Sequence, residues 1–386
     1  MKSSRGASTR RESSSCSVNP RIVVEVKFSE WTADGKLRQP IYLGTRDDKD
    51  PYEVGREKQS VQKKDSPKPA TKADGSKSRL IRSLQEIEDG PGSGTVEIDG
   101  RSLAVTNLKK VFFPKKKLTK GDLMRYYATV ASLVLPVMKD RPLVLKRFPN
   151  GIDGKAFFQQ NAGETPEGVR VETIETQGGS TNLRIVGGDL YTLLYTVQLG
   201  AISVDPWHSR IQSLDFADYA IIDLDPGPRA TFSRVIQVAR WVKEALDKLD
   251  LHAALKTSGS SGLHVYLPLP PRAPNEAAML VSQIIATRVA EAYPKVATVE
   301  RSVKARGTTT VYVDYLQNII GKTVAGAYSA RANPDAMVST PLAWDELTDD
   351  LDPRDFTIET APARFAEVGD IWAAAMKKRN SLKSLS

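Results

Sequence analysis

The chain has 386 residues, of which 55 are Lys or Arg and 46 are Asp or Glu, and its formal net charge is +9. Its length suggests two or three domains, and Cys16 is its only cysteine, which excludes a small scaffold held together by disulfides. No apolar run approaches the roughly 20 residues that cross a bilayer, and the first residues lack the apolar stretch of a secretory signal. We therefore expect a soluble, cytoplasmic protein with no membrane partner.

The positive charge is concentrated in one stretch. Residues 101–155 hold 13 basic and 3 acidic side chains, whereas residues 156–386 hold 23 basic and 27 acidic ones. A basic region beside an acidic half is typical of a nucleic-acid enzyme whose carboxylates hold metal ions. The lysines at 115–117 could equally form a solvated turn, so a polyanionic partner has to be argued from other residues.

Composition divides the chain into four regions. Residues 1–20 are rich in Ser and Arg, which predicts a disordered tail. Residues 21–54 predict a small β segment, because alternating apolar residues are followed by a turn and a second strand. Residues 55–92 mix Lys, Pro, Ser and Gly without periodicity and predict a flexible linker. We expect a globular domain over residues 93–380.

The globular domain alternates predicted helices and strands. Helices are expected at about 119–138, 190–199, 231–249 and 276–293, with Thr119 and Asp189 as caps of the first two. Strands are expected at 219–224, 253–256, 263–269 and 310–315. Because these elements follow no strict βαβ repeat, we predict an α/β or α+β fold with a mixed β-sheet and flanking helices.

Carboxylates gather at the ends of two predicted strands. Asp223 and Asp225 point to the same face, because residues i and i+2 of a strand do so, and Asp314 lies near the end of another strand. Carboxylates held close together repel one another unless cations lie between them, and oxygen ligands suit Mg²⁺ or Mn²⁺. Three such groups can hold two divalent ions for phosphoryl transfer. Alternatively, Asp225 is a turn residue and Asp223 a surface charge.

A loop rich in Gly and Ser occupies residues 257–262, between two predicted strands. Gly259 would let backbone N–H groups approach phosphate oxygens, and Ser258 would add a hydroxyl donor. His264, on the next strand, is a candidate phosphate contact. The alternatives are an ordinary hairpin turn and a buried core histidine.

Eight short motifs occur in a fixed order. They are VTNLKK at 105–110, KLTK at 117–120, KRFPNG at 146–151, FFQ at 157–159, DLDPG at 223–227, TSGSSGLHV at 257–265, VDYLQN at 313–318 and YSARA at 328–332. With these motifs, residues 96–378 resemble the polymerase domain of bacterial DNA ligase D, a member of the archaeo-eukaryotic primase superfamily. The resemblance implies a primase-polymerase catalytic core.

The resemblance implies a role for each matching residue. The metal-binding catalytic carboxylates would be Asp223, Asp225 and Asp314, with two Mn²⁺ or Mg²⁺ ions. The phosphates of a nucleoside triphosphate, ribo or deoxyribo, would meet Ser258, Gly259, His264 and Arg331. A DNA gap or end with a 5′-phosphate would be gripped by Lys110, Lys120, Lys146 and Arg147. Template bases would stack on Phe157 and Phe158.

The family typically prefers ribonucleotides and Mn²⁺, and it acts in non-homologous end joining. The resemblance therefore also implies Ku and a DNA ligase as partners, and association with the nucleoid.

Three residues depart from the family pattern. Ser261 stands where a lysine is usual, Asp205 where a histidine is usual, and Gln160 where a lysine is common. Each departure removes a positive charge or a donor. Losing a charge-assisted contact typically costs roughly 1.5 to 3 kcal/mol, so we expect weaker nucleotide affinity.

The N-terminal segment carries a second resemblance. Residues 23–51 resemble the last half of the OB-fold that ends an ATP-dependent DNA ligase, with RDDK at 46–49 matching its RxDK motif. KADG at 72–75 matches the KxDG adenylation motif, but it follows the OB-like segment and has no flanking strands. We interpret it as a chance match and expect no ligase activity.

The sequence thus predicts a template-directed nucleotidyltransferase that extends or fills DNA ends and gaps. One alternative is a catalytically weakened module that binds DNA ends and recruits partners, which Ser261 and Asp205 favour. The other is a primase that starts chains without a primer.

Overall fold

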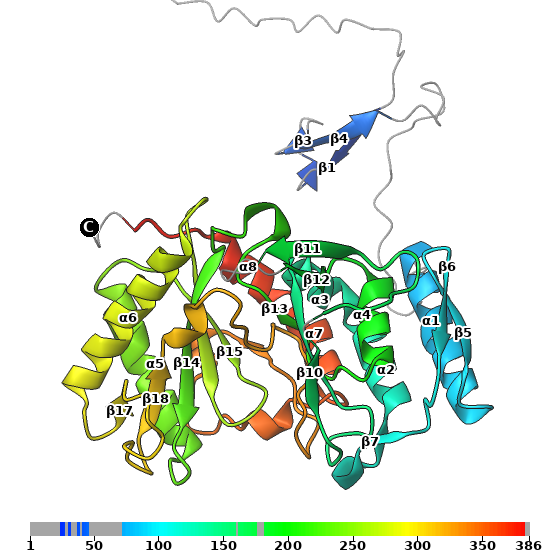
Figure 1. The fold of residues 1–386 in the computed structure, drawn as a ribbon. Coiled ribbons are helices and arrows are strands. Elements are labelled where there is room, and N and C mark those ends of the chain that lie inside the picture. The colour runs from blue at the N-terminus through cyan, green and yellow to red at the C-terminus, as the bar shows by residue number, and fades with distance from the viewer. Residues whose placement is uncertain are drawn as a thin grey trace, which may run out of the picture. The chain divides into compact units, whose positions relative to one another are not determined.

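The computed structural model describes residues 24–27, 30–31, 37–38, 41–45, 72–159, 161–175 and 181–382. The chain divides into two compact units, Met1–Pro69 and Ala70–Ser386 (Figure 1). The predicted tail at 1–20 and the part of the predicted linker before residue 72 lie outside the described residues.

Short antiparallel strand pairs make up the described part of the first unit. β1 (Val24–Lys27) pairs with β4 (Ile41–Thr45), and these are the two strands that the alternating pattern predicts. Between them, β2 (Glu30–Trp31) pairs with β3 (Leu37–Arg38) on either side of the predicted turn.

The second unit begins with a helix, α1 (Lys72–Asp89). Our prediction of a linker at 55–92 is wrong from Lys72 onward. Leu80 and Leu84, four residues apart, are buried in the core, and Glu88 pairs with Arg125 of α2 (Lys120–Thr129). The Lys- and Ser-rich residues before Leu80 hid this helical spacing in the composition.

The predicted helix at 119–138 is divided in two. Thr119 is the N-cap of α2, as predicted, and its hydroxyl accepts from the backbone N–H of Asp122 in a capping box. The helix ends at Thr129, and α3 (Ala131–Met138) begins after Val130, which caps both helices.

The first part of this unit combines helices with short strand pairs. Its further elements are β5 (Gly94–Ile98), β6 (Arg101–Val105), β7 (Val111–Phe113), β8 (Leu118–Thr119), β9 (Leu143–Arg147), β10 (Phe157–Gln159), β11 (Val171–Glu175), β12 (Thr181–Ile185), α4 (Leu190–Gln198) and β13 (Asp205–Pro206). β10, β9 and β13 form a three-stranded sheet in that order. In its register, Phe158 lies opposite Lys146, and Asp205 lies opposite Val144.

The second part is built on a six-stranded sheet. Its elements are β14 (Tyr219–Pro226), α5 (Phe232–Asp247), β15 (Ala254–Thr257), β16 (Leu263–Pro268), α6 (Asn275–Ala292), β17 (Ala297–Thr298), β18 (Val311–Asp314), β19 (Pro341–Leu342), α7 (Ala361–Val368) and α8 (Ile371–Lys377). The strand order is β17-β18-β14-β16-β15-β19. β17 and β18 are parallel and the other neighbours are antiparallel, so the predicted mixed sheet is confirmed.

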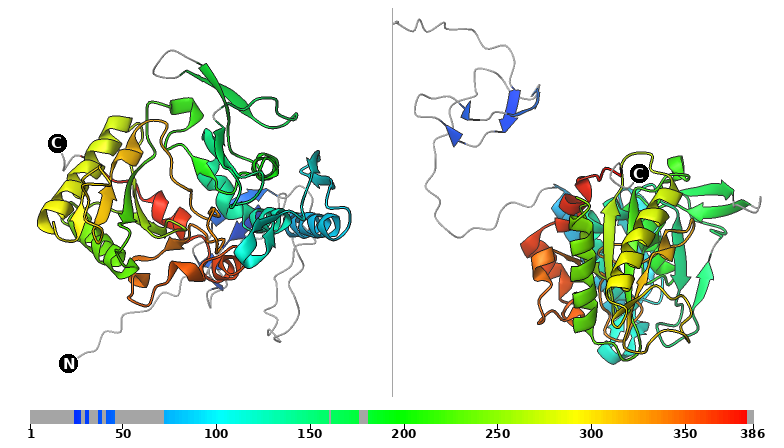
Figure 2. Two further views of the ribbon diagram at one scale, coloured as in Figure 1. Left: turned by 60° about the horizontal axis from the view of Figure 1, so that its bottom comes forward. Right: turned by 90° about the vertical axis from the view of Figure 1, so that its left-hand side faces the viewer.

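Helices α5 and α6 cover one face of this sheet, as Figure 1 and the right-hand view of Figure 2 show. Ile222 and Leu224 of β14 pack with Val235 and Val238 of α5 in one hydrophobic cluster. Side chains alternate along a strand, so the residues between them on β14 face the other side of the sheet. That side is where the site lies.

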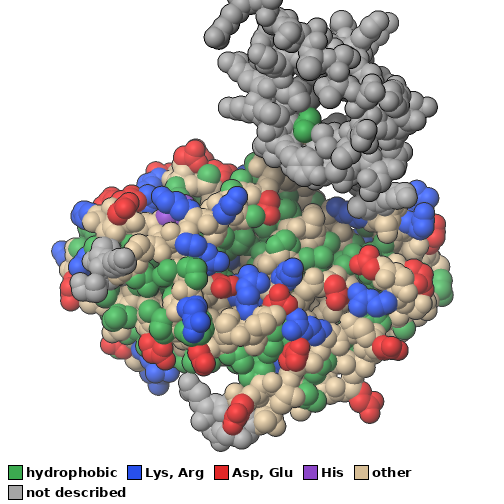
Figure 3. Space-filling view, turned by 90° about the horizontal axis from the view of Figure 1, so that it is seen from above, with side chains coloured by type: hydrophobic (Ala, Val, Ile, Leu, Met, Phe, Trp, Pro, Cys, Tyr) green, Lys and Arg blue, Asp and Glu red, His purple; other side chains and the backbone are tan. Residues whose placement is uncertain are grey.

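The exposed surface carries charges of both signs. On the face that Figure 3 shows, Lys and Arg side chains are interspersed with Asp and Glu, so the excess of basic residues forms no single-sign patch there. Among the described helices, none is long and apolar enough to span a membrane.

Candidate active site

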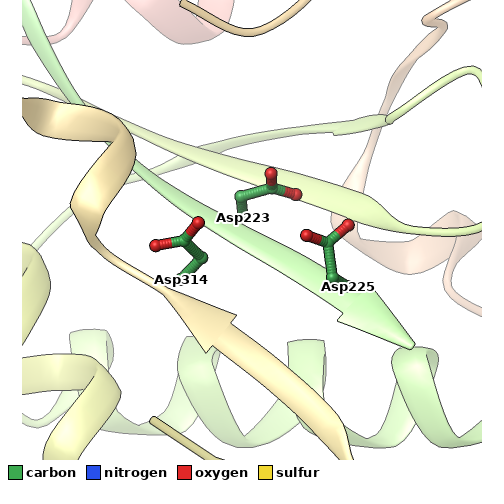
Figure 4. A group of neighbouring side chains, drawn as sticks. All are labelled: Asp223, Asp225 and Asp314. Atoms are coloured by element: carbon green, nitrogen blue, oxygen red, sulfur yellow. The ribbon is translucent and has the colours of Figure 1, made fainter. Parts of the chain in front are cut away.

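Three carboxylates converge on the open face of the six-stranded sheet. Asp223 and Asp225 lie two residues apart on β14, and Asp314 of β18 pairs directly with Asp223. Figure 4 shows all three side chains on the side of the sheet away from the helices beneath it. One ligand oxygen of each lies within 4.8 Å of the others. The structure therefore brings together the three predicted carboxylates.

A row of polar side chains crosses the sheet from Asp314 and Asp223 to His264 and Lys256. The register aligns Asp223 with His264 of β16, and His264 with Lys256 of β15. Lys256 Nζ lies 2.7 Å from His264 Nδ1 and donates to Ala325 O at 2.9 Å. His264 Nε2 lies 3.2 Å from Asp223 Oδ1. With Nδ1 accepting from Lys256, the ring proton is on Nε2, facing the carboxylate.

The two basic side chains of this row, Lys256 and His264, are buried. Burial, then the charges of Lys256 and Arg331, hold the pKa of His264 well below its usual range. Burial and the charge of Arg331 likewise lower the pKa of Lys256. His264 is therefore a neutral imidazole in the folded protein and brings no positive charge to Asp223.

Asp223 and Asp225 resist ionisation in the absence of a cation. Burial, followed by the charge of Asp314, raises the pKa of Asp223 to about 7. Asp225 is exposed in the pocket, yet desolvation and then the charges of Asp223 and Asp314 raise its pKa to about 7 as well. Within the described residues, the buried Asp223 Oδ1 accepts no hydrogen bond, because the nearby Nε2–H of His264, 3.2 Å away, is not aligned with it. Crowded carboxylates with an unpartnered oxygen fit a divalent cation such as Mg²⁺ or Mn²⁺.

Asp314 is held in place by its neighbours. Its Oδ1 accepts from the Leu316 backbone N–H at 2.7 Å and from Tyr312 Oη at 3.2 Å, and its Oδ2 accepts from Gln317 Nε2 at 2.9 Å. This carboxylate is therefore oriented before any ion binds.

The Gly/Ser loop borders the same pocket, a cavity of about 380 Å³. Ser258 Oγ accepts from the backbone N–H groups of Ser260 and Gly262, at 3.1 and 3.0 Å, so those two groups are occupied within the loop. The hydroxyl proton of Ser258 remains to be donated. The expected cradle of backbone N–H groups is thus replaced, for these two residues, by one hydroxyl.

Gly259 and Arg331 fix the shape of this loop. Gly259 has a φ of +69°, and a Cβ atom there would lie 2.7 Å from the backbone N of Ser339, so only glycine fits. Arg331 Nη1 donates to Ser258 O at 2.8 Å, and the Arg331 side chain also lines the pocket. The four predicted nucleotide-binding residues, Ser258, Gly259, His264 and Arg331, therefore lie together at the carboxylates.

The three-stranded sheet supplies the opposite wall of the pocket. Phe158, Lys146 and Asp205 all line it. Asp205 accepts from Ser203 Oγ at 2.9 Å. Burial raises the pKa of Asp205, against the charges of Arg331, Lys256 and Lys146, which lower it.

The predicted DNA-binding cations occupy two places. Lys146 faces the catalytic pocket, whereas Arg147, the next residue of β9, points to the other face and donates to Leu199 O at 2.6 Å. Lys110 and Arg147 lie close to Lys120. After desolvation, the charges of these two residues lower the pKa of Lys120 to about 8. We call Lys110, Lys120 and Arg147 the basic cluster.

Neutral acceptors surround the two lysines of the basic cluster. Lys120 is 5% exposed, and its Nζ donates to Thr106 O, Gln198 O and Gln198 Oε1 at 2.8 to 3.0 Å, which occupies all three of its protons. Lys110 Nζ donates to Pro149 O at 2.9 Å and Asn150 Oδ1 at 3.0 Å, which leaves one proton. Lys110 is therefore the lysine with a donor to offer.

The paired aromatics stand out from the surface. Phe157 is 44% and Phe158 61% exposed, values that a core aromatic would not have. Arg147 lies 5.2 Å from the Phe157 ring centre and Lys146 lies 5.6 Å from that of Phe158. Exposed rings backed by cations are suited to stacking on bases next to a phosphate chain.

Two site residues were missed by sequence reasoning. Lys256 is a lysine within an otherwise apolar strand, and a buried charge of that kind was the available signal. Gln317 belongs to the quoted VDYLQN motif but carried no assigned role. Of the three departures from the family pattern, Asp205 and Ser261 line the pocket, and Gln160 lies outside the described residues.

Family models match both parts of the chain. One described as "LigD, primase-polymerase domain" matches residues 119–372, and one described as "ATP dependent DNA ligase C terminal region" matches residues 2–49.

Similar curated proteins come from several bacteria. The "Bifunctional non-homologous end joining protein LigD" of Bacillus subtilis (strain 168) is 34% identical over 268 residues, which cover 69% of this chain and 43% of that protein. The "Multifunctional non-homologous end joining protein LigD" of Pseudomonas aeruginosa is 28% identical over 360 residues, which cover 92% of this chain and 40% of that protein. The chain thus spans about two fifths of the length of these relatives.

A solved structure matches the fold. The "Polymerase Domain from Mycobacterium tuberculosis Ligase D in complex with DNA" aligns with a TM-score of 0.67 and 30% sequence identity, over 72% of this chain and 99% of that one. The family match covers more than half of the chain and includes all three carboxylates. The chain belongs to the LigD primase-polymerase domain family.

Proposed function

We propose that this chain is a template-directed nucleotidyltransferase that extends a DNA 3′ end at a gap or break during non-homologous end joining. The observation that carries the proposal is the convergence of Asp223, Asp225 and Asp314 in a pocket that also holds the Ser258 loop and Arg331. Three carboxylates beside donors for phosphate suit phosphoryl transfer and little other chemistry.

Each wall of the pocket has a task in this proposal. Asp223, Asp225 and Asp314 would hold two divalent ions, which would supply Lewis acidity to the phosphoryl transfer. The Ser258 hydroxyl and the Arg331 guanidinium bind the triphosphate. Lys146 on the facing wall adds a positive charge beside the phosphates. Mn²⁺ and Mg²⁺ are both suited to such oxygen ligands.

The DNA would lie outside the pocket, along the basic cluster and the exposed aromatics. Lys110, with one free proton, and the charges of Lys120 and Arg147 would attract a 5′-phosphate. Phe157 and Phe158 would stack on template bases, which is sequence-tolerant because every base has a π-face. A 5′-phosphorylated gap or end is therefore the DNA that we propose as substrate.

The partners follow from the similar proteins. The relatives are named for non-homologous end joining, and the matched structure contains DNA. We propose that Ku and a ligase act with this chain, at the nucleoid in the cytoplasm. Residues 2–49 match only the C-terminal region of ATP-dependent ligases, so we expect no ligase activity from these residues alone.

Primer extension tests the proposal. A gapped, 5′-phosphorylated DNA is offered with Mn²⁺ and either ribonucleotides or deoxyribonucleotides, to the wild-type chain and to Asp223→Ala. Addition that requires both the ion and Asp223 supports the proposal. No addition at millimolar nucleotide, with DNA binding retained, would favour the end-binding module, to which Asp205 and Ser261 in the pocket also point. Addition on an unprimed template would instead indicate a primase.

A further inference from the structure

A second cavity lies on the sheet face that carries the carboxylates, at the other end of β14. Its volume is about 310 Å³, and none of the described residues that line it also lines the catalytic pocket. Tyr219 of β14 belongs to its lining, and Asp223 lies four residues further along the strand. The two side chains therefore share a face but are separated by roughly 14 Å along the strand. We call this space the α8 cavity, because Trp372, Ala373 and Met376 of α8 line one side of it.

The lining of the α8 cavity is mostly apolar. Tyr219 packs on Tyr266 of β16 with ring centres 4.9 Å apart, and Tyr266 meets Trp372 edge to face at 4.8 Å. Leu133 and Val137 of α3 extend the same surface. Ligand pockets with apolar linings are typically roughly 300 to 1,000 Å³ in volume, so the α8 cavity is large enough to hold a bulky apolar side chain.

Cations surround this apolar surface. The charged residues of the lining are two carboxylates and four cations, namely Asp218, Asp370, Arg141, Arg210, Lys377 and Arg379. Asp218 Oδ2 accepts from Arg141 Nη2 and, at 2.8 Å, from Arg210 Nε. Asp370 Oδ1 accepts from Tyr328 Oη at 2.7 Å. Both carboxylates are therefore bonded within the protein, and the cations are in excess.

Several donors of these cations remain free. A guanidinium has five N–H protons. Arg379 uses only Nη1, which donates to two backbone oxygens at 2.6 and 3.2 Å. Arg210 uses Nε and Nη1, the latter for Lys139 O at 3.0 Å. Within the described part of the chain, Nη2 of both arginines and Nζ of Lys377 donate to no protein atom, and Lys377 and Arg379 are exposed.

The charge of Arg141 is only partly balanced. Its side chain is 4% exposed, and its Nε has no hydrogen-bond partner among the residues that the structure describes. It also shares Asp218 with Arg210. A buried charge destabilises the fold unless an opposite charge lies close to it. An anion bound among the exposed cations would therefore stabilise this arginine as well.

The α8 cavity suits a ligand that is apolar at one end and anionic at the other. A peptide has this form where a large apolar side chain lies between Asp or Glu residues. A nucleic-acid strand does not fit, because Tyr219, Tyr266 and Trp372 are 3 to 6% exposed and pack on one another, so they offer bases no open ring face. Phe157 and Phe158, which we assign to DNA, are 44% and 61% exposed. The lining therefore favours an acidic peptide over DNA.

We propose that the α8 cavity is a docking site for an acidic segment of a partner protein. A large apolar side chain of that segment enters the cavity, and its Asp or Glu neighbours pair with Arg210, Lys377 and Arg379. The site can be filled while nucleotide and DNA are bound, because it shares no described residue with the catalytic pocket, the basic cluster or the exposed aromatics. Lys377 and Arg379 also lie beyond residues 119–372, so the family match does not account for them.

Fluorescence anisotropy tests the proposal with synthetic peptides, in the absence of DNA and nucleotide. The probes are fluorescein-labelled peptides of seven residues, with Leu, Phe or Trp at the centre and Asp or Glu elsewhere. At least one of them should bind saturably. A matched peptide with Ala at the centre, and one with Lys in place of every acidic residue, should each bind at least about 10-fold more weakly. The first loses the apolar anchor and the second loses the ion pairs.

Variants test whether the peptide binds in the α8 cavity. Ala373→Phe fills the cavity and keeps every charge, and Arg379→Ala removes a cation, so each should weaken binding of the acidic peptide at least about 10-fold. Lys378→Ala is the matched control, because this exposed lysine precedes Arg379 but does not line the cavity, and its affinity should stay within about twofold of wild type. Lys377→Ala replaces Arg379→Ala if circular dichroism shows that the latter does not fold.

The inference is wrong if no acidic peptide binds at concentrations up to about 1 mM, or if the Ala-centred peptide binds as tightly as the others. It is also wrong if Ala373→Phe leaves the affinity unchanged, or if Lys378→Ala lowers it as much as Arg379→Ala does. A duplex DNA is the last probe. An affinity for DNA that falls in Arg379→Ala but not in Lys378→Ala would assign these cations to DNA instead of a partner protein.

Discussion

The second unit holds two clusters of like charge, and they are built in opposite ways. Asp223, Asp225 and Asp314 lie on strands whose register fixes their spacing, and the buried Oδ1 of Asp223 accepts no hydrogen bond within the described residues. In the basic cluster, by contrast, Lys120 donates all three of its ammonium protons to carbonyl and amide oxygens.

The two clusters differ in whether they need a bound ion of opposite charge. The basic cluster is stabilised by neutral acceptors, so it can persist without a phosphate. In the carboxylate cluster, burial and then the charges of the neighbouring carboxylates raise the pKa values of Asp223 and Asp225. The carboxylate cluster therefore needs a bound cation to be fully ionised, whereas the basic cluster is stable without a bound anion.

Asp223→Asn tests most directly whether the carboxylate cluster carries an uncompensated charge. The change should lower kcat for extension at least about 100-fold, since groups that only support metal ligands already cost 10- to 100-fold when lost. It should also stabilise the metal-free protein at pH 8, by on the order of 1–3 kcal/mol, because it removes a buried, uncompensated charge. Primer extension and urea unfolding in EDTA measure the two effects. Lower stability of the variant would show that the carboxylate is already compensated.

The pH dependence of stability probes the same cluster. The pKa of Asp223 is about 7 in the folded chain and 3.8 in the unfolded one, so between about pH 4 and 7 the folded state holds the extra proton. Unfolding then releases a proton, and the free energy of unfolding falls by a few kcal/mol as pH rises through this range. Urea unfolding at pH 5 and pH 8 in EDTA checks the sign.

Two controls accompany this pH measurement. Asp223→Asn should flatten the decrease, and Mn²⁺ should raise the melting temperature more at pH 8 than at pH 5, because the ion binds the ionised carboxylates. A decrease that survives unchanged in the variant would assign it to other groups.

Lys120→Met tests the other side of the comparison. The methionine keeps the apolar stem but leaves Thr106 O and Gln198 O without their donor, so we expect a loss of about 1–3 kcal/mol in the free energy of unfolding. Urea unfolding measures it. A variant as stable as wild type would mean that these bonds contribute nothing to the fold and that Lys120 serves DNA alone.

The facing of the β14 carboxylates and the start of α2 were predictable because their signals are local. The alternation on β14 places Asp223 and Asp225 on one face, and Thr119 is a helix cap by its residue type and position. The partnership of Asp314 with Asp223 comes from strand register, which adjacent residues do not encode. Asp314 was grouped with Asp223 through the family motifs instead.

Other features depend on contacts that sequence alone does not specify. Helix α1 was predicted as linker because composition outweighed the spacing of Leu80 and Leu84. The separation of Lys146 from the basic cluster follows from the alternation of β9, which we did not apply to neighbouring cations. Lys256 gave no signal beyond its presence in an apolar strand.

The smallest expected effect tests whether Lys110, rather than the other residues of the basic cluster, contacts the 5′-phosphate. Lys110→Ala should weaken binding of a 5′-phosphorylated gap about 10-fold and lower the slope of log affinity against log salt by about 1, since one phosphate contact is lost. The same DNA with a 5′-hydroxyl should be bound by variant and wild type within about twofold. Fluorescence anisotropy over a salt series measures both, with Lys117→Ala, an exposed lysine of the same basic stretch, as matched control. Equal losses on the two DNAs would make Lys110 a general backbone contact and leave the 5′-phosphate to another residue.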